Sequence, residues 1–189
     1  MSAFPTSFRI AQAVGLTSAA WLSGTIFSLS YITIPVLLQS HHDHAIPLQP
    51  ITKQWRTLYE TGKRRVPPLA LLTASTFLYL AWRVRHNTPV EALASKHSMA
   101  VYVGSALLTL GIVPWTAVVM GGTNGELMAW AERGGDGVRE EKGKGVEKDD
   151  KEEEEERVRG LLARWGWLNA GRAVWPLLGG VVSLMGGLV

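Results

Sequence analysis

The distribution of charge constrains the fold of this chain more than any other feature. Residues 10–38, 66–82 and 98–125 contain no Asp, Glu, Lys or Arg, and residues 165–189 contain only Arg172. A helix needs about 20 largely apolar residues to cross a bilayer, and each of these stretches has that length or nearly so. The sequence therefore predicts an all-α integral membrane protein, a four-helix bundle with polar loops.

The predicted bundle forms a single transmembrane domain that covers the whole chain. Its helices are expected at about residues 10–38, 66–83, 98–122 and 160–188. In the first loop, Trp55, Leu58 and Tyr59 recur at helical spacing and predict a short amphipathic helix. Residues 134–157 are rich in Gly, Glu, Lys and Asp and are expected to form a disordered acidic loop. Its last acidic run, residues 152–156, could also begin the fourth helix, because acidic side chains stabilise a helix N-terminus.

Small residues and prolines indicate how the predicted helices pack and bend. Gly15, Ala19 and Ser23 recur every four residues, so they lie on one helix face and suit close packing. Pro35 and Pro114 are expected to kink the first and third helices. Pro67 and Pro68 are expected in the first turn of the second helix, where proline is tolerated.

The overall composition excludes several classes of function. The chain contains no cysteine, which removes disulfides, thiolate metal sites, iron–sulfur clusters and dithiol redox chemistry. The net charge of +3 does not indicate nucleic-acid binding, because the basic residues adjoin apolar segments and anchor them at the membrane interface. The lipid bilayer is the expected partner, in a multi-pass topology within the endoplasmic reticulum or another endomembrane. The oligomeric state stays open.

The unusual polar residues gather at one end of the predicted bundle. Four crossings bring the two termini to one side and the loops after helices one and three to the other. Asn169 and Arg172 share one stripe of the last helix with Trp165, and Thr116 and Thr123 share one on the third. Since ionisable residues at membrane depth usually face the interior of the bundle, Arg172 is expected to line a polar pocket. The alternative is an arginine that snorkels to the interface.

The run His41, His42, Asp43 and His44 raises the question of a metal site. Adjacent residues in a loop rarely converge on one ion, so a solvated loop is favoured and no metal is predicted. One of these histidines could still act as a general base.

Four motifs, in this order, resemble those of the fungal anthrone oxygenases, small membrane proteins first catalogued as a domain of unknown function. They read GLTSAAWLSG, KQWRTLYETGK, GIVPWTAVVMGGTNGEL and RWGWLNAGRA. The resemblance covers nearly the whole chain except the acidic insertion at about 134–160, and the HHDH run is not part of the family pattern. That pattern falls on Trp55, Tyr59, Pro114, Thr116, Thr123, Asn124, Trp165, Asn169 and Arg172.

The resemblance implies an enzyme that converts an anthrone and dioxygen to an anthraquinone and water without a cofactor, in aromatic polyketide (secondary metabolite) biosynthesis. Deprotonation would give an anthracenolate that reacts with oxygen. Arg172, Asn169 and Asn124 would stabilise its oxyanion. Tyr59 is one candidate base, a loop histidine is another, and Glu60 and Glu126 stay open. The expected substrate-binding residues are Trp55, Thr116, Thr123 and Trp165, of which the two tryptophans would stack on the rings.

Two other classes of function are compatible with the same sequence. The chain could be a non-catalytic membrane scaffold or an accessory subunit of a polyketide pathway, its polar stripes merely holding helices together. It could also carry an aromatic metabolite, although the lack of an internal repeat argues against a transporter.

Overall fold

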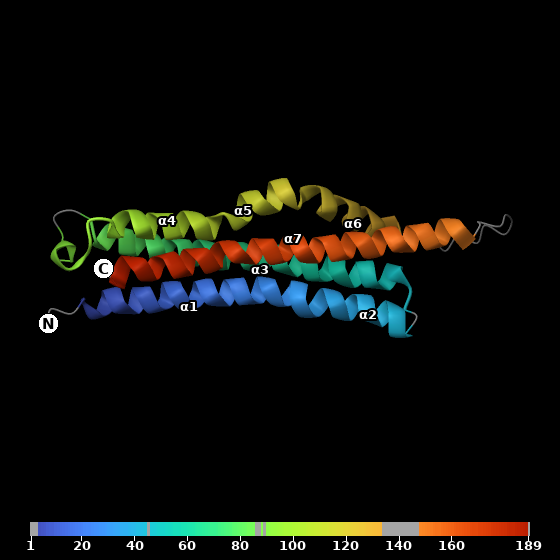
Figure 1. The fold of residues 1–189 in the computed structure, drawn as a ribbon, viewed down its shortest axis with the longest axis horizontal. Helices are drawn as coiled ribbons and strands as arrows, with labels where there is room; N and C mark the ends of the chain where they lie inside the picture. The colour runs from blue at the N-terminus through green and yellow to red at the C-terminus, as the bar shows by residue number, and fades with distance from the viewer. Residues whose placement is uncertain (1–3, 45, 86–87, 89, 134–147, 189) are drawn as a thin grey trace.

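The computed structural model describes residues 4–44, 46–85, 88, 90–133 and 148–188. Within this part of the chain the backbone forms helices and short turns and no β-strand, so the all-α prediction is confirmed. The helical segments form long rods that lie side by side (Figure 1). The first rod begins and the last rod ends at the same end of the molecule, as an even number of crossings predicts.

The first rod is longer than expected. It consists of α1 (Thr6–Ser28), the π-helical turn η1 (Leu29–Thr33) and α2 (Ile34–His44), which follow one another without a break. Proline lacks an N–H, and its ring clashes with the carbonyl of the preceding turn. The wider π turn directly before Pro35 accommodates that ring. The predicted kink therefore takes the form of a π-helical turn, and the helix continues beyond residue 38 to the histidine run.

The second rod corrects the prediction of two separate helices. A single helix, α3 (Leu48–Arg83), joins the amphipathic segment to the apolar segment predicted at residues 66–83. Pro67 and Pro68 therefore lie in the helix interior and not in a first turn. They remove two N–H donors, but the buried side chains Ile51 and Trp55 hold the preceding turns in line with the rest of the helix.

The third rod contains the strongest departure from straight geometry. It begins after the 3₁₀ turn η2 (Glu91–Leu93) and consists of α4, α5, η3 and α6. These elements span Ser98–Leu110, Ile112–Pro114, Trp115–Val119 and Gly121–Arg133 respectively. The rod was predicted to end near residue 122. The expected bend is present, because the third rod arches away from α7 between α5 and α6 in Figure 1, and a π turn again accompanies the proline, here Pro114.

The last rod, α7 (Lys148–Leu188), begins earlier than residue 160. The disorder predicted for residues 134–157 is therefore wrong for residues 148–157, which are helical, while residues 134–147 lie outside the described part of the chain. Acidic side chains favour a helix N-terminus, and the next turns are anchored by the buried side chains Val158 and Leu162.

The predicted stripe of small residues holds the rods together. A side chain at Gly15 would bring a Cβ atom within 2.7 Å of the Phe77 ring, so only glycine allows α1 and α3 this approach. Ser23 donates a hydrogen bond of 2.8 Å to the carbonyl of Ala173 on α7. The packing role expected for this face is therefore confirmed.

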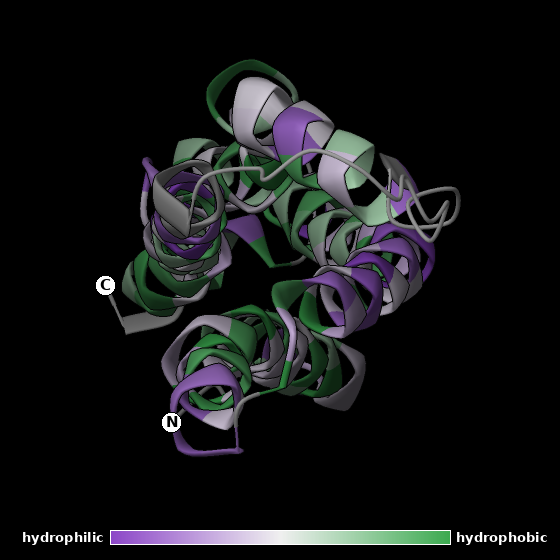
Figure 2. Cartoon of the chain, turned by 90° about the vertical axis from the view of Figure 1, so that its right-hand side faces the viewer, coloured by the Kyte–Doolittle hydropathy of each residue, from purple (hydrophilic) through white to green (hydrophobic). Residues whose placement is uncertain are grey.

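Polar and apolar residues separate along the rods. Two helices of the described chain, Thr6–His44 and Ser98–Val119, are long and apolar enough to cross a membrane. Seen from the end where α2 and α6 finish, hydrophilic residues colour many of the nearest turns (Figure 2). The amphipathic part of α3, together with α6 and the first turns of α7, thus forms a polar end, and the candidate site lies beside it.

Candidate functional site

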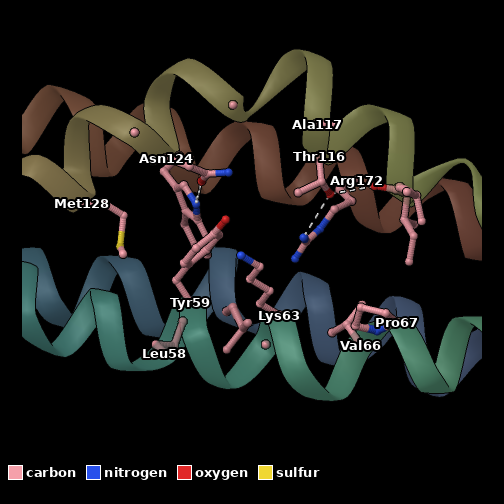
Figure 3. A pocket seen from close by; sticks show the side chains of 17 residues that line it. Leu58, Tyr59, Lys63, Val66, Pro67, Thr116, Ala117, Asn124, Met128 and Arg172 are labelled. Carbon is pink, nitrogen blue, oxygen red and sulfur yellow. Dashed lines mark hydrogen bonds between the residues drawn. The ribbon is translucent and has the colours of Figure 1, made fainter.

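A cavity of about 590 Å³ lies between α3 and the bent third rod (Figure 3). Its apolar lining includes Leu29, Leu58, Val66, Ile112 and Met128. Its polar lining consists of Tyr59, Lys63, Thr116, Asn124, Trp165 and Arg172. A few polar groups in a mostly apolar cavity of this size are typical of small-molecule binding sites, which measure about 300–1,000 Å³.

The bend in the third rod makes room for this cavity. Beyond Pro114, the third rod is tied to α7 by Trp115, which donates a hydrogen bond of 3.0 Å from Nε1 to the carbonyl of Leu168. The same indole lies against Gly171, where a Cβ atom would be 3.0 Å from its ring. The third rod therefore contacts α7 through Trp115, and the space between the third rod and α3 stays open as the cavity.

Arg172 is the charged group of α7 that faces the cavity. Its Nη1 donates to Thr116 Oγ1 at 3.2 Å and its Nη2 donates to Asn169 Oδ1 at 2.6 Å. Its Nε is buried without a hydrogen-bond partner. Within the described chain no carboxylate pairs with this guanidinium. An uncompensated cation that is partly buried in this way is suited to bind an anion.

Both acceptors of Arg172 are themselves held in position. Asn169 is fully buried, and its Nδ2 donates to the carbonyl of Ile26 and to Ser30 Oγ, each at 2.8 Å. Its Oδ1 is therefore turned toward Arg172. Thr116 donates its own proton to the carbonyl of Ile112 at 2.7 Å, so its hydroxyl oxygen accepts from the guanidinium. The π turn η1 and the third rod together fix the direction of the positive charge.

A second polar pair lines the cavity nearer the end of the molecule. Trp165 donates from Nε1 to Asn124 Oδ1 at 2.9 Å, which orients the amide so that its Nδ2 points away from the indole (Figure 3). Tyr59 lies beside this pair, stacked on Trp55 with ring centroids 5.3 Å apart and an interplanar angle of 13°. Its hydroxyl makes no hydrogen bond within the described residues and points toward the cavity.

The predicted site residues fall into two groups in the structure. Five of them line the cavity: Tyr59, Thr116, Asn124, Trp165 and Arg172. Asn169 lies behind Arg172 and reaches the cavity only through it. Trp55 and Thr123 are buried outside the cavity lining, so the structure does not bring these two predicted substrate-binding residues to the cavity.

The reasons why Trp55 and Thr123 lie outside the cavity lining are local. Trp55 lies one helical turn before Tyr59 on α3, and the tyrosine ring covers it on one side while Trp165 meets it edge-on at 5.8 Å. Thr123 precedes Asn124 on α6, and one step along a helix turns a side chain by about 100°, which moves it away from the cavity.

Lys63 lines the cavity but was absent from the predicted site. The sequence interpretation assigned the three consecutive cations at residues 63–65 to the membrane interface. Lys63 lies four residues after Tyr59 and hence on the same helix face. That spacing was the signal that could have identified it.

The histidine run and the two open glutamates do not contribute to the cavity lining. His41 is bound to the carbonyl of Ile46 at 2.8 Å, and no group of three or more His, Asp or Glu suited to a metal ion occurs among the residues that the structure describes. Glu60 pairs with Arg56 at 3.0 Å and Glu126 with Arg157 at 3.4 Å. Among the candidate bases, Tyr59 is therefore the one in contact with the cavity.

Comparison with known proteins gives a consistent result. A family profile described as anthrone oxygenase matches residues 55–182. An anthrone oxygenase of Aspergillus fumigatus is 33% identical over 93% of this chain and 91% of its own length. An anthrone oxygenase of Paecilomyces divaricatus is 31% identical over 93% and 94%, and a noranthrone monooxygenase of Aspergillus flavus is 29% identical over 92% and 71%. No solved structure matches the chain.

Proposed function

The chain belongs to the anthrone oxygenase family, and on that premise we propose that it converts an anthrone and dioxygen to an anthraquinone and water in the cavity between α3 and the third rod. The reaction belongs to aromatic polyketide biosynthesis. The single observation that carries the proposal is the guanidinium of Arg172, which faces an apolar cavity without a carboxylate partner in the described chain.

The first step is the removal of a proton from the methylene carbon of the anthrone. That carbon lies between two aryl rings and is acidified by the ketone through conjugation. Tyr59, in its phenolate form, is the proposed base, because its oxygen is directed into the cavity and makes no hydrogen bond within the described residues. The proton moves to the base, and the negative charge moves to the ketone oxygen, where Arg172 stabilises it.

Dioxygen reacts with the electron-rich anion in the second step. One electron passes from the anion to dioxygen, and the two radicals combine to form a carbon–oxygen bond at the former methylene carbon. The peroxide takes a proton, and loss of the remaining hydrogen from that carbon breaks the O–O bond. One oxygen atom ends in the quinone carbonyl and the other leaves as water, so atoms and electrons balance without a cofactor or a metal.

The other lining groups orient the flat substrate. Trp165 offers an indole to the ring system, and its hydrogen bond to Asn124 leaves the Nδ2 of that amide as a donor for a substrate oxygen. Thr116 keeps the guanidinium in place. Since the lining is mostly apolar, it excludes water and strengthens the attraction between Arg172 and the anion.

The proposal includes a membrane-spanning four-helix bundle in the endoplasmic reticulum or another endomembrane. Large apolar side chains are exposed on all four rods, including Trp21 at 71%, Leu71 at 62%, Leu107 at 65% and Trp167 at 80%. Soluble monomers rarely expose apolar surface on this scale, which fits contact with lipid. A tricyclic aromatic partitions into the same phase, so substrate and enzyme meet there. Resistance of the protein to carbonate extraction of isolated membranes tests this part.

A direct assay tests the function. The purified full chain in detergent is mixed with anthrone in air-saturated buffer, and quinone absorbance is followed with and without a metal chelator. We expect turnover above the spontaneous rate that the chelator does not reduce and that added flavin does not raise. Absence of turnover in the wild type would contradict the function and favour a non-catalytic accessory role. Turnover that stops with the chelator would contradict cofactor independence alone.

A further inference from the structure

A tyrosine can accept the methylene proton only as a phenolate, and a tyrosine in water keeps its own proton up to about pH 10. Some group near Tyr59 must therefore stabilise negative charge on its oxygen. Hydrogen bonds within the described residues do not, because the Tyr59 oxygen makes none there. A neighbouring cation is the other means by which a protein favours the charged form of an acid.

Two cations line the cavity in the described chain, Lys63 and Arg172, and no Asp or Glu lines it. Arg172 is already engaged, because its two Nη atoms donate to Thr116 and Asn169 and the oxyanion of the substrate forms in front of it. Lys63 has no such engagement. No carboxylate of the described chain pairs with it.

Lys63 lies where its charge can act on Tyr59. The two residues are four positions apart on α3, a spacing that puts side chains next to each other on one helix face. Both side chains extend from α3 toward the third rod, and their polar ends turn toward one another (Figure 3). The stacking of Tyr59 on Trp55 fixes the position of the phenol, and the longer lysine side chain can adjust to it.

The other charged groups of this part of α3 and of α6 are engaged with one another. Arg56 and Glu60 on α3 pair at 3.0 Å, and Glu132 on α6 lies 3.7 Å from the same arginine. All three lie outside the cavity lining. In the described chain the first rod contributes no charged residue to the lining, and α7 contributes Arg172 alone. The charges that face Tyr59 from the cavity are thus those of Lys63 and Arg172.

We propose that Lys63 is a positioning residue whose ammonium group pairs with the phenolate of Tyr59 and so keeps the base ready to accept a proton. This inference rests on the proposed function. When the phenolate takes the methylene proton, Tyr59 becomes neutral and the negative charge moves to the ketone oxygen at Arg172. The phenol then returns the proton to the peroxide anion, and the phenolate forms again beside Lys63. Each cation therefore stabilises one anion in turn, and the proton is conserved.

The pH at which the phenolate forms can be measured on the purified full chain without any substrate. Tyrosinate has its own ultraviolet absorbance, and subtracting the titration of Tyr59→Phe from that of the wild type isolates Tyr59 among the four tyrosines. The same subtraction is made in the Lys63→Met background. An opposite charge within about 4–6 Å favours the charged form by about 1–3 pH units, and the lower end applies here because Lys63 is exposed.

We therefore expect the titration midpoint to be higher in Lys63→Met than in the wild type by about one pH unit. Lys63→Arg keeps the charge and should keep the midpoint close to that of the wild type. Equal midpoints in the wild type and in Lys63→Met would overturn the proposal.

Turnover of anthrone gives a second readout. In Lys63→Met the pH profile of kcat/KM is expected to move to higher pH by the same amount, about 10-fold less activity on its acid side, with an unchanged plateau. A role in folding alone would lower the plateau at every pH, and that result would overturn the proposal.

Arg64→Met is the matched control, because it removes an equal charge from the next position of α3, which lies outside the cavity lining. It is expected to leave both the midpoint and the profile unchanged. A shift as large as that of Lys63→Met would overturn the proposal, since any cation of this segment would then have the same effect.

Failure of the proposed function can be told apart from failure of this inference. If the wild type does not oxidise anthrone, the tyrosinate titration still reports on the pair. A midpoint that rises in Lys63→Met and is restored in Lys63→Arg supports the pairing of Lys63 with Tyr59 even then, and a midpoint that does not rise overturns it.

Discussion

Replacement of Arg172 by methionine separates the roles of this residue in catalysis and in stability. Methionine keeps an unbranched apolar side chain on α7 but removes the charge and the hydrogen bonds to Thr116 at 3.2 Å and Asn169 at 2.6 Å. Loss of one oxyanion donor from an enzyme typically lowers kcat by about 100- to 1,000-fold. We expect a loss of at least this size, because Arg172 is the cation at the deep end of the cavity.

The same substitution is expected to leave the protein at least as stable as the wild type. Each lost hydrogen bond to a charged group is worth about 1.5–3 kcal/mol. In the wild type, removing the guanidinium from water costs several kcal/mol. No carboxylate of the described chain offsets this cost, and Nε has no hydrogen-bond partner. The two contributions nearly cancel, so the net change in unfolding free energy is small.

The two expectations are measured on the same sample. Quinone formation from anthrone gives kcat/KM, and thermal unfolding in detergent gives Tm, which for a chain of this size changes by about 2–4 °C per kcal/mol. Arg172→Lys serves as a control that keeps the charge but loses the bidentate hydrogen-bond donation of the guanidinium. Wild-type turnover in Arg172→Met would refute the assignment. A large drop in Tm together with lost activity would instead indicate a structural arginine.

Two further substitutions test the packing and the support of the site. Gly179→Ala would bring a Cβ atom within 2.7 Å of the Ser105 carbonyl, so we expect overpacking to destabilise the chain by about 1–3 kcal/mol. The control Gly24→Ala, whose Cβ would have nothing within 4 Å, should be neutral or stabilising. An equal Tm in the two variants would contradict this expectation. Ser30→Ala removes one of the two hydrogen bonds that orient Asn169, and we expect it to lower kcat more than it raises KM. Ser30→Thr, which keeps the hydroxyl, should restore activity. An unchanged kcat in Ser30→Ala would contradict the positioning role of Ser30.

The sequence predicted the arrangement of the helices better than their ends. Three charge-free stretches and a fourth that contains only Arg172 each coincide with a helical part of the described chain, since a long apolar segment has few alternatives to a helix. The ends were missed where a polar segment continues a helix without a change of direction. The acidic turns before Val158 have a polar composition that resembles a loop. The amphipathic turns before Val66 were predicted as a separate short helix, and the burial of Trp55 and Leu162 against other rods accompanies the longer helices that the structure has.

Spacing along single helices predicted five of the six polar residues in the cavity lining, but not which side chain of a shared helix face reaches the cavity. Tyr59 and Trp55 share one face of α3, and the choice between them depends on how closely α7 approaches. The two π turns near Pro35 and Pro114 shift the register of their rods, and a regular helical period does not anticipate that shift. Lys63 was missed because charge at a helix end has an ordinary explanation as an interface anchor.

The central claim is that the cavity binds an anthrone and removes its methylene proton. Exchange of that proton with deuterated solvent under strictly anaerobic conditions measures this step without oxygen chemistry. The account predicts that the wild-type protein accelerates exchange above the buffer rate, and that Tyr59→Phe and Arg172→Met each abolish the acceleration. Exchange at the buffer rate in the presence of a wild-type protein that still forms quinone in air would contradict it.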